Sequence, residues 1–166
     1  MRTQTQAMST SEPSLEPARE EPQDMSSVCG MQIHRVTLDE VFAAIDDRVA
    51  RRDPGFVVTP NVDHICNYHR NADFQRIYKK SFLVVADGTW VVWASHLLRQ
   101  PVPQKISGSD LVFWLSEHAA KKGHSLFLFG APNGVAERAA KVLEKKYPGL
   151  RIAGTYCPPF GFQNDE

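Results

Sequence analysis

Two short apolar segments, each followed by a small polar cluster, place the strongest limit on how this chain folds. Residues 56–58 and 82–86 are β-branched, aromatic or aliphatic, with no alternating polar residues. That pattern is typical of strands buried on both faces of a parallel sheet. The residues between the two segments have helical character. The order strand, helix, strand predicts a parallel βαβ unit.

The polar residues that follow these two segments are expected to meet at one edge of the sheet. Thr59 and Asn61 follow the first segment, and Asp87 follows the second. Ligands of open α/β sheets bind beyond the carboxyl ends of the strands. Asp87 is therefore a ligand-binding carboxylate, the cap of a helix that starts near Thr89, or both, because a cap needs only one of its oxygens. Asn61 likewise either contacts a ligand or caps the helix that follows it.

The rest of the chain predicts an α/β fold with a doubly wound, mainly parallel, Rossmann-like sheet and helices on both faces. The helix expected over 90–98 is apolar nearly all round, so we expect it to be buried, with Trp90 and Trp93 in the core. Further strands are expected near residue 33, at 125–129 and at 150–153, and further helices at 38–49, 107–122 and 134–146.

Composition and cysteine spacing argue against several classes of function. Nineteen basic and nineteen acidic residues cancel, which predicts no nucleic-acid partner. The three cysteines lie far apart and form no CxxC pair, so neither a disulfide framework nor a zinc site is indicated. His64 and His69 are five residues apart and do not share a helix face, so we expect no metal site there.

The ends of the chain predict one folded domain after a disordered leader. Residues 1–27 are polar and rich in Ser, Thr, Glu and Pro, a composition that cannot offset its ordering entropy. We expect the folded domain over residues 28–166. No apolar run has the length of a membrane span, and the first thirty residues lack the apolar core of a signal peptide. These features predict a cytoplasmic protein.

Two glycine-bearing loops are candidate contacts for a ligand. Gly108 permits a close backbone approach or an unusual turn at the start of a helix. The loop at 130–134, which contains Gly130 and Asn133, links a strand to a helix and is either a phosphate-binding loop or a tight turn. It lacks the GK[ST] and GxGxxG patterns, which argues against a P-loop nucleotidase and a Rossmann oxidoreductase.

Five motifs in this order and spacing resemble the WecG/TagA/CpsF glycosyltransferases, which form glycosyltransferase family 26. The motifs are TPN at 59–61, ADG at 86–88, SGSDL at 107–111, LFLFGAPNGVAERAA at 126–140 and YPGLRIAGTY at 147–156. The resemblance implies an inverting enzyme that needs no metal or other cofactor. It would move a sugar resembling N-acetylmannosamine from a UDP-sugar to a polyprenyl-diphosphate-linked saccharide during cell-surface or extracellular polysaccharide synthesis.

The same resemblance implies roles for individual residues. Asp87 would be the catalytic general base. Lys105 stands where many relatives carry an arginine and would hold the UDP pyrophosphate, although lysine lacks the bidentate fork of arginine. The remaining predicted substrate-binding residues are Thr59, Asn61, Gly108, Gly130 and Asn133.

The resemblance also bears on partners and on the extent of the chain. Relatives continue beyond the position of Glu166 with further strands and a C-terminal appendage linked to membrane association. We therefore expect this sequence to be the N-terminal portion of such an enzyme, in peripheral contact with the inner face of the cell membrane. An uncovered sheet edge predicts self-association into a homo-oligomer. The alternative is a non-catalytic nucleotide-sugar binding module or an inactive fragment.

Overall fold

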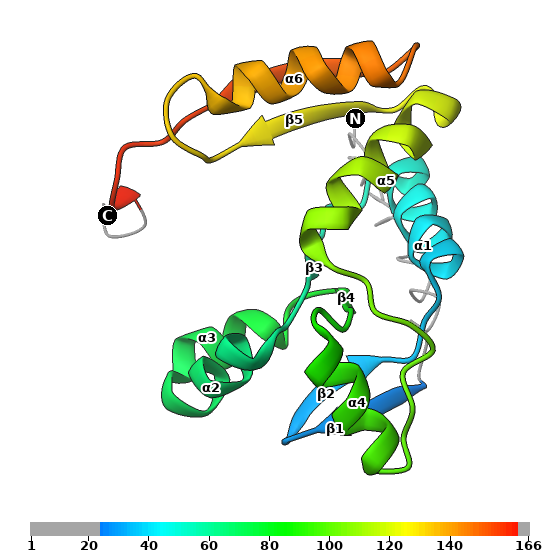
Figure 1. Ribbon diagram of the computed structural model, residues 1–166, viewed down its shortest axis with the longest axis vertical. Helices are drawn as coiled ribbons and strands as arrows, with labels where there is room; N and C mark the ends of the chain where they lie inside the picture. Colours follow the sequence, from blue (N-terminus) through cyan, green and yellow to red (C-terminus); the bar gives the residue numbers. More distant parts are fainter. Residues whose placement is uncertain (1–23, 163–166) are drawn as a thin grey trace, which may run out of the picture.

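The computed structural model describes residues 24–162, and these residues form an α/β structure with small parallel sheets (Figure 1). In chain order the elements are β1 (Met25–Val28), β2 (Met31–His34), α1 (Leu38–Arg51), β3 (Val57–Val58), α2 (Val62–Arg70), α3 (Ala72–Tyr78), β4 (Leu83–Val84), α4 (Thr89–Leu97), α5 (Gly108–Lys122), β5 (Ser125–Phe129), α6 (Val135–Lys146) and β6 (Arg151–Tyr156).

An antiparallel hairpin of β1 and β2 begins the described part of the chain. Its two-residue turn places Cys29 at φ 49° and Gly30 at φ 77°, the positive angles that a tight hairpin turn of this kind requires. Regular structure thus starts at Met25, earlier than expected, because β1 pairs with β2. The part of the expected leader that covers residues 1–23 lies outside the described residues.

The predicted βαβ unit is confirmed by the parallel pairing of β3 with β4. Val57 lies opposite Leu83, and Val58 lies opposite Val84. The backbone N–H of Val85 extends the pairing by donating to Val58 O at 2.9 Å. On its other side β4 contacts the hairpin, where the buried His34 accepts a hydrogen bond at Nδ1 from the Val84 N–H at 3.0 Å. Sequence reasoning did not identify this use of His34.

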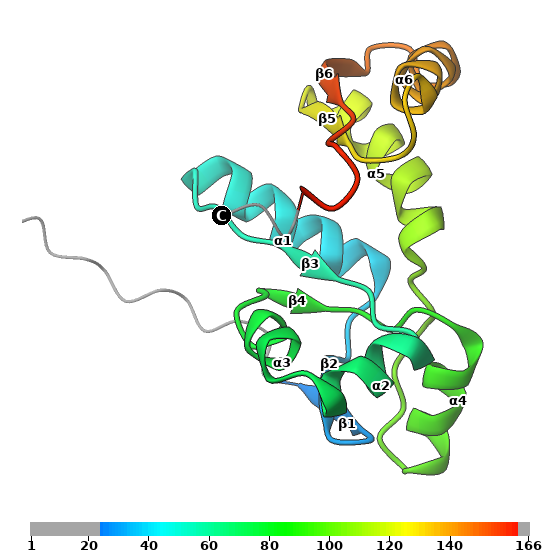
Figure 2. The ribbon, with the colours of Figure 1, turned by 90° about the vertical axis from the view of Figure 1, so that its left-hand side faces the viewer.

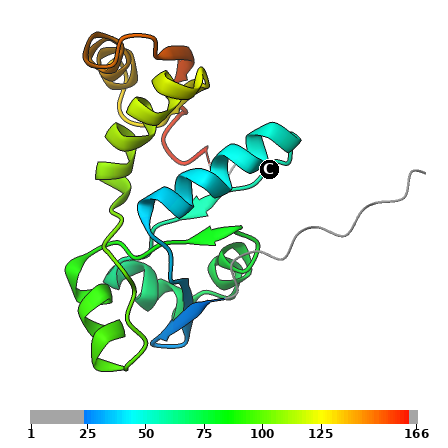
Figure 3. The same cartoon turned by 90° about the vertical axis from the view of Figure 1, so that its right-hand side faces the viewer.

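Helices cover both faces of the β3–β4 pair, as predicted (Figures 2 and 3). Leu83 and Val85 pack with residues of α1 and α5 in one apolar cluster. Val84 and Ala86 pack with residues of α2, α3 and α4 in another. The uninterrupted apolar run at 82–86 therefore reflects burial on two sides.

The predicted single, doubly wound sheet is not seen among the described residues. They form three two-stranded sheets, and β5 pairs in parallel only with β6. The long helix α5 carries the chain past α1 to the β5–β6 layer at the opposite end of the molecule from α4 (Figure 1). Leu126 and Leu128 pack toward α5 and α6, whereas Phe127 and Phe129 on the other face are 57% and 59% exposed.

The expectation that the helix after Asp87 is buried is wrong. Of the residues in α4, only Val91 and Ser95 are buried, and both Trp90 and Trp93 are largely exposed. The helix lies at one end of the molecule and packs one narrow face on β1 and its surroundings. Apolar composition alone did not reveal how few neighbours cover it. Within residues 24–162, no helix combines the length and apolarity needed to cross a bilayer.

Candidate active site

The carboxyl ends of β3 and β4 and the start of α5 come together through backbone hydrogen bonds. The Asp87 N–H donates to Pro60 O at 3.0 Å, which joins the two strand-end loops. The Ile106 N–H donates to Ala86 O at 2.8 Å, which brings the segment before α5 to the same edge. These bonds place Thr59, Asp87 and Gly108 in one group, called the strand-end group below.

Asp87 is half-buried in the strand-end group, and its carboxylate makes few contacts. Its Oδ2 lies 3.4 Å from the backbone N of Gly108, a long hydrogen bond. The N-cap of α4 is Gly88, at φ 93°, and no side chain among the described residues caps that helix. The cap interpretation of Asp87 is therefore wrong. Its carboxylate faces the strand-end group and is not used to hold the helix.

Thr59 and Gly108 approach each other so closely that a side chain at 108 would disturb the contact. A Cβ atom built on Gly108 would lie 3.0 Å from Thr59 Oγ1. This distance is shorter than ordinary van der Waals contact, so glycine permits the start of α5 to lie against the end of β3. The predicted close backbone approach at Gly108 is thus present, and its neighbour is Thr59.

Asn61 caps α2, which was one of its two predicted uses. Its Oδ1 accepts a hydrogen bond from the His64 N–H at 3.0 Å. The side chain is exposed, and its Nδ2 has no hydrogen-bond partner within residues 24–162. The cap occupies one end of the amide and leaves the other end accessible, so ligand contact stays a prediction.

Lys105 lies directly before Ile106, whose N–H joins the start of α5 to the strand-end group. Its side chain approaches the carboxylate of Asp110, a pairing that sequence reasoning did not identify. Its Nζ lies 4.0 Å from Oδ2 of Asp110 on α5, and both side chains are partly exposed. A partly exposed ion pair of this length contributes little to stability. Lys105 lies just before α5 and Asp110 lies in its first turn, and this closeness in the sequence could have predicted the pair.

Gly130 and Asn133 lie apart from the strand-end group. Gly130, at φ 101°, ends β5 and donates its N–H to Tyr156 O at 2.9 Å. Asn133 is exposed in the loop before α6. Because β5 and β6 form a separate sheet, the structure does not bring these two residues beside Asp87. Their substrate-binding role stays a prediction.

Comparison with known proteins identifies the chain at the level of family. The model of the WecG/TagA/CpsF glycosyl transferase family matches residues 26–166. The chain belongs to this family.

Curated relatives of this WecG/TagA/CpsF chain include N-acetylglucosaminyldiphosphoundecaprenol N-acetyl-beta-D-mannosaminyltransferases of Staphylococcus aureus strains NCTC 8325 and COL. Each is 34% identical over 98 residues, which is 59% of this chain and 39% of the relative. The matched part of the chain thus spans about two-fifths of the length of these relatives.

A second carboxylate of this family member, Asp46 on α1, has a different environment. Its Oδ1 contacts Nε2 of His118 at 2.8 Å and Nε2 of His124 at 3.0 Å, and its Oδ2 contacts Nζ of Lys122 at 3.0 Å. Burial raises the pKa of Asp46, but hydrogen bonds from these three partners outweigh burial and lower the pKa to about 2. The Asp46 cluster ties α1 to the end of α5, and sequence reasoning did not identify it.

The two histidines that were considered as metal ligands have separate partners in the fold. His64 Nδ1 lies 2.6 Å from the Tyr78 hydroxyl, and His69 Nε2 lies 2.6 Å from Cys29 O. Burial raises the pKa of Tyr78 to about 12, so its hydroxyl stays protonated beside His64 Nδ1. Across residues 24–162, no cluster of three or more His, Cys, Asp or Glu side chains has the geometry of a metal site.

Proposed function

We propose that this chain carries the catalytic base and acceptor-side contacts of an inverting glycosyltransferase. The reaction would move a sugar such as N-acetylmannosamine from a UDP-sugar to a polyprenyl-diphosphate-linked saccharide in cell-surface polysaccharide synthesis. The observation that carries the proposal is the half-buried carboxylate of Asp87, which lies at the end of β4 in one group with Thr59 and Gly108 and accepts a single long hydrogen bond from the described part of the chain. Family membership and the names of the curated relatives support the same reaction class.

In this proposal Asp87 removes the proton of the attacking hydroxyl. An acceptor hydroxyl becomes a good nucleophile only if its proton leaves as the new glycosidic bond forms. A carboxylate suits this task when its oxygens are accessible and not fully engaged in structural hydrogen bonds. A single displacement at the anomeric carbon inverts its configuration, so an α-linked donor yields a β-linked product.

The leaving group requires stabilisation of negative charge on the UDP phosphates. Lys105 would supply a cation by exchanging its 4.0 Å contact with Asp110 for a phosphate oxygen. Thr59 and the free end of the Asn61 amide would hydrogen-bond hydroxyls of the donor or acceptor. No step of this scheme calls for a metal or an organic cofactor.

Gly130 and Asn133 enter the proposal as contacts to the donor phosphates. The loop at 130–134 exposes backbone N–H groups before α6, an arrangement that suits an anion. This role requires β5 to join the β3–β4 sheet in one doubly wound sheet, which would bring the loop to the same edge as Asp87. A protein with a lipid-linked acceptor would work in the cytoplasm at the inner face of the membrane.

The proposal is tested by a transfer assay together with calorimetry. The 166-residue chain is incubated with UDP-N-acetylmannosamine and a diphospholipid-linked N-acetylglucosamine, and the disaccharide product is measured by mass spectrometry. Binding of UDP and UDP-sugars is measured in parallel. We expect both binding and product. Binding without product would show that the chain is a nucleotide-sugar binding module, and absence of both would contradict the proposal.

A further inference from the structure

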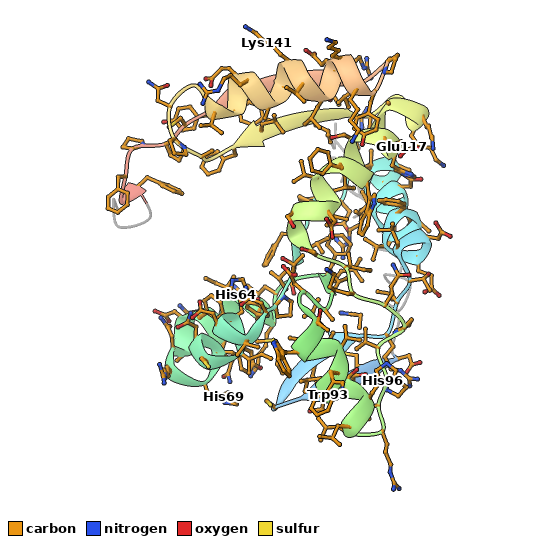
Figure 4. All side chains as sticks on the ribbon, viewed as in Figure 1. His64, His69, Trp93, His96, Glu117 and Lys141 are labelled. Atoms are coloured by element: carbon orange, nitrogen blue, oxygen red, sulfur yellow. The ribbon has the colours of Figure 1, made fainter. Side chains whose placement is uncertain are left out.

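One face of α4 exposes an unusual amount of apolar surface. Trp90, Trp93 and Leu97 are 70%, 60% and 69% exposed, and the spacing of three and four residues places them on one side of the helix. The two indole rings contact each other edge to face, with centroids 6.3 Å apart. We call these three residues the α4 apolar face. Trp93 and the neighbouring His96 lie at the end of the molecule farthest from the β5–β6 layer (Figure 4).

The opposite side of α4 is anchored, so the apolar face is presented on a well-packed helix. Val91 and Ser95 are buried, and Ser95 Oγ accepts a hydrogen bond from the Val102 N–H at 3.0 Å. The turn after the helix is tied to β1, because Gln100 Oε1 accepts from the Ser27 N–H at 2.7 Å. The exposed tryptophans therefore cannot turn inward without breaking these contacts.

The charged residue that follows the α4 apolar face in the sequence is a cation, Arg99. The 22 residues from 88 to 109 include no aspartate and no glutamate, and Arg99, which follows the helix, is exposed. Lys105, later in the same stretch, lies 4.0 Å from Asp110 and adds no net charge. Arg35, which donates from Nε to Pro101 O in the loop after α4, is paired with Asp24 at 3.0 Å and adds no net charge. The surface thus joins apolar side chains with the exposed cation of Arg99.

We propose that the α4 apolar face docks onto the surface of an anionic lipid bilayer. Tryptophan prefers the membrane–water interface, because its ring is apolar while its N–H still reaches water. An exposed arginine such as Arg99 is attracted to anionic headgroups. A helix of nine residues is about 13 Å long, too short to cross a bilayer, so α4 lies in the plane of the interface.

Docking through α4 would hold Asp87 at the membrane surface. The helix begins at Thr89, two residues after Asp87, so the base sits beside the docked surface. A diphosphate-linked saccharide on a lipid presents its sugar at that level of the membrane. This consequence rests on the proposed function, whereas the docking itself depends only on the α4 apolar face and its charges.

Vesicle binding without any sugar nucleotide tests the docking separately from catalysis. The full 166-residue chain is mixed with vesicles of phosphatidylcholine alone or with phosphatidylglycerol at about one third of the lipid, and flotation gives the partition coefficient. We expect binding that is stronger on the anionic vesicles and that weakens with salt. The double variant Trp90→Ser/Trp93→Ser should lower the partition coefficient about tenfold or more. The variant Arg99→Glu should lower it on anionic vesicles only.

Intrinsic fluorescence gives a second, site-specific readout. The chain contains three tryptophans, and Trp114 is half-buried in the core cluster beside α1. The variant Trp114→Phe leaves only the two indoles of α4, whose emission should shift to shorter wavelength on anionic vesicles and be quenched by brominated lipid tails. Phe127→Ser, which removes an equally exposed aromatic ring at the other end of the molecule, is the matched control and should bind like the parent.

Several results would overturn the docking proposal. The first is failure of the parent chain to bind anionic vesicles. The second is a Trp90→Ser/Trp93→Ser variant that has native circular dichroism and binds as well as the parent. The third is a Phe127→Ser variant that loses as much binding as the double variant. Loss of a dimer in sedimentation by the double variant, with vesicle binding intact, would likewise show that a second copy of the chain covers this face.

Discussion

Asp46 and Asp87 are both partly buried carboxylates beside the ends of long helices, yet their surroundings differ sharply. Asp46 contacts two histidines and a lysine, all within 3.0 Å, and its pKa is lowered to about 2. Within residues 24–162, Asp87 has one long hydrogen bond to its carboxylate, from the Gly108 N–H at 3.4 Å. One carboxylate has its hydrogen-bonding capacity occupied by the fold, and the other does not.

This difference separates a structural carboxylate from a candidate functional one. A carboxylate that already accepts several charged hydrogen bonds holds elements together and is a poor proton acceptor. A carboxylate left with open acceptor positions at the carboxyl end of a strand is available to a ligand. Substitutions at the two positions should therefore have opposite effects on stability and on catalysis.

The largest expected effect is the loss of sugar transfer on substitution Asp87→Asn. The amide cannot accept the hydroxyl proton, so we expect kcat/KM to fall by about 10²–10⁴-fold. Stability should change by less than about 0.5 kcal/mol, because the carboxylate makes one long hydrogen bond. Rates come from the transfer assay and stability from urea denaturation. Transfer near the parental rate would contradict the assignment of the base.

The next effect is a loss of stability, without a direct effect on chemistry, on substitution Asp46→Asn. Removal of the charge from the Asp46 cluster should lower the free energy of unfolding by on the order of 1–2 kcal/mol. Urea denaturation measures the change, with Asp47→Asn, on the exposed neighbouring position, as the control. A stable variant would show that the three partners of Asp46 do not hold α1 to α5.

The difference in free energy of unfolding between the parent and Asp46→Asn should also depend on pH. The folded-state pKa of Asp46, about 2, lies below its ordinary value of 3.8. The stabilising contribution is therefore fully present above about pH 4 and is lost as the pH falls toward 2. The stability difference between the parent and Asp46→Asn should shrink over that range. A difference that stays constant down to pH 2 would argue against the assigned cause.

A smaller effect is expected at Asn61, where two substitutions separate the cap from ligand contact. Asn61→Ala removes the acceptor for the His64 N–H and should cost about 1 kcal/mol of stability. Asn61→Asp keeps an acceptor at the helix start and should keep stability. If the Nδ2 end binds a substrate hydroxyl, Asn61→Asp should still raise KM. Equal KM values for Asn61→Asp and the parent would restrict Asn61 to its cap.

The smallest effect on stability is expected at Lys105. Its contact with Asp110 is 4.0 Å long and partly exposed, so Lys105→Ala should change stability by less than about 0.5 kcal/mol. Calorimetry with UDP should nevertheless show weaker binding for Lys105→Ala. Lys105→Arg should bind UDP at least as tightly as the parent, because a guanidinium holds phosphate at two points. Equal UDP affinity in all three proteins would remove Lys105 from the donor site.

Several parts of the fold followed from local sequence patterns. The continuous apolar run at 82–86 correctly predicted a parallel strand buried on two faces, and the TPN and ADG clusters correctly predicted strand ends that meet. The pattern at 90–98 misled, because a helix that is apolar all round is normally buried, whereas α4 leaves Trp90 and Trp93 exposed. A hydrophobic pattern in the sequence indicates that a side chain favours an apolar environment. It does not indicate how many other residues pack against that side chain in the fold.

The sequence by itself determined the α/β class, the parallel pairing of β3 with β4, the family, and the choice of Asp87 as the candidate base. These depend on periodicity and on motif order, which are local properties of the chain. Only the tertiary structure decided that Gly108 lies against Thr59, that Asp46 has three hydrogen-bonding partners, and that the described residues leave the α4 apolar face exposed. Each of these depends on residues that are distant in sequence, or on the lack of a neighbour. Such relations are set by how packed elements meet, and no local pattern encodes them.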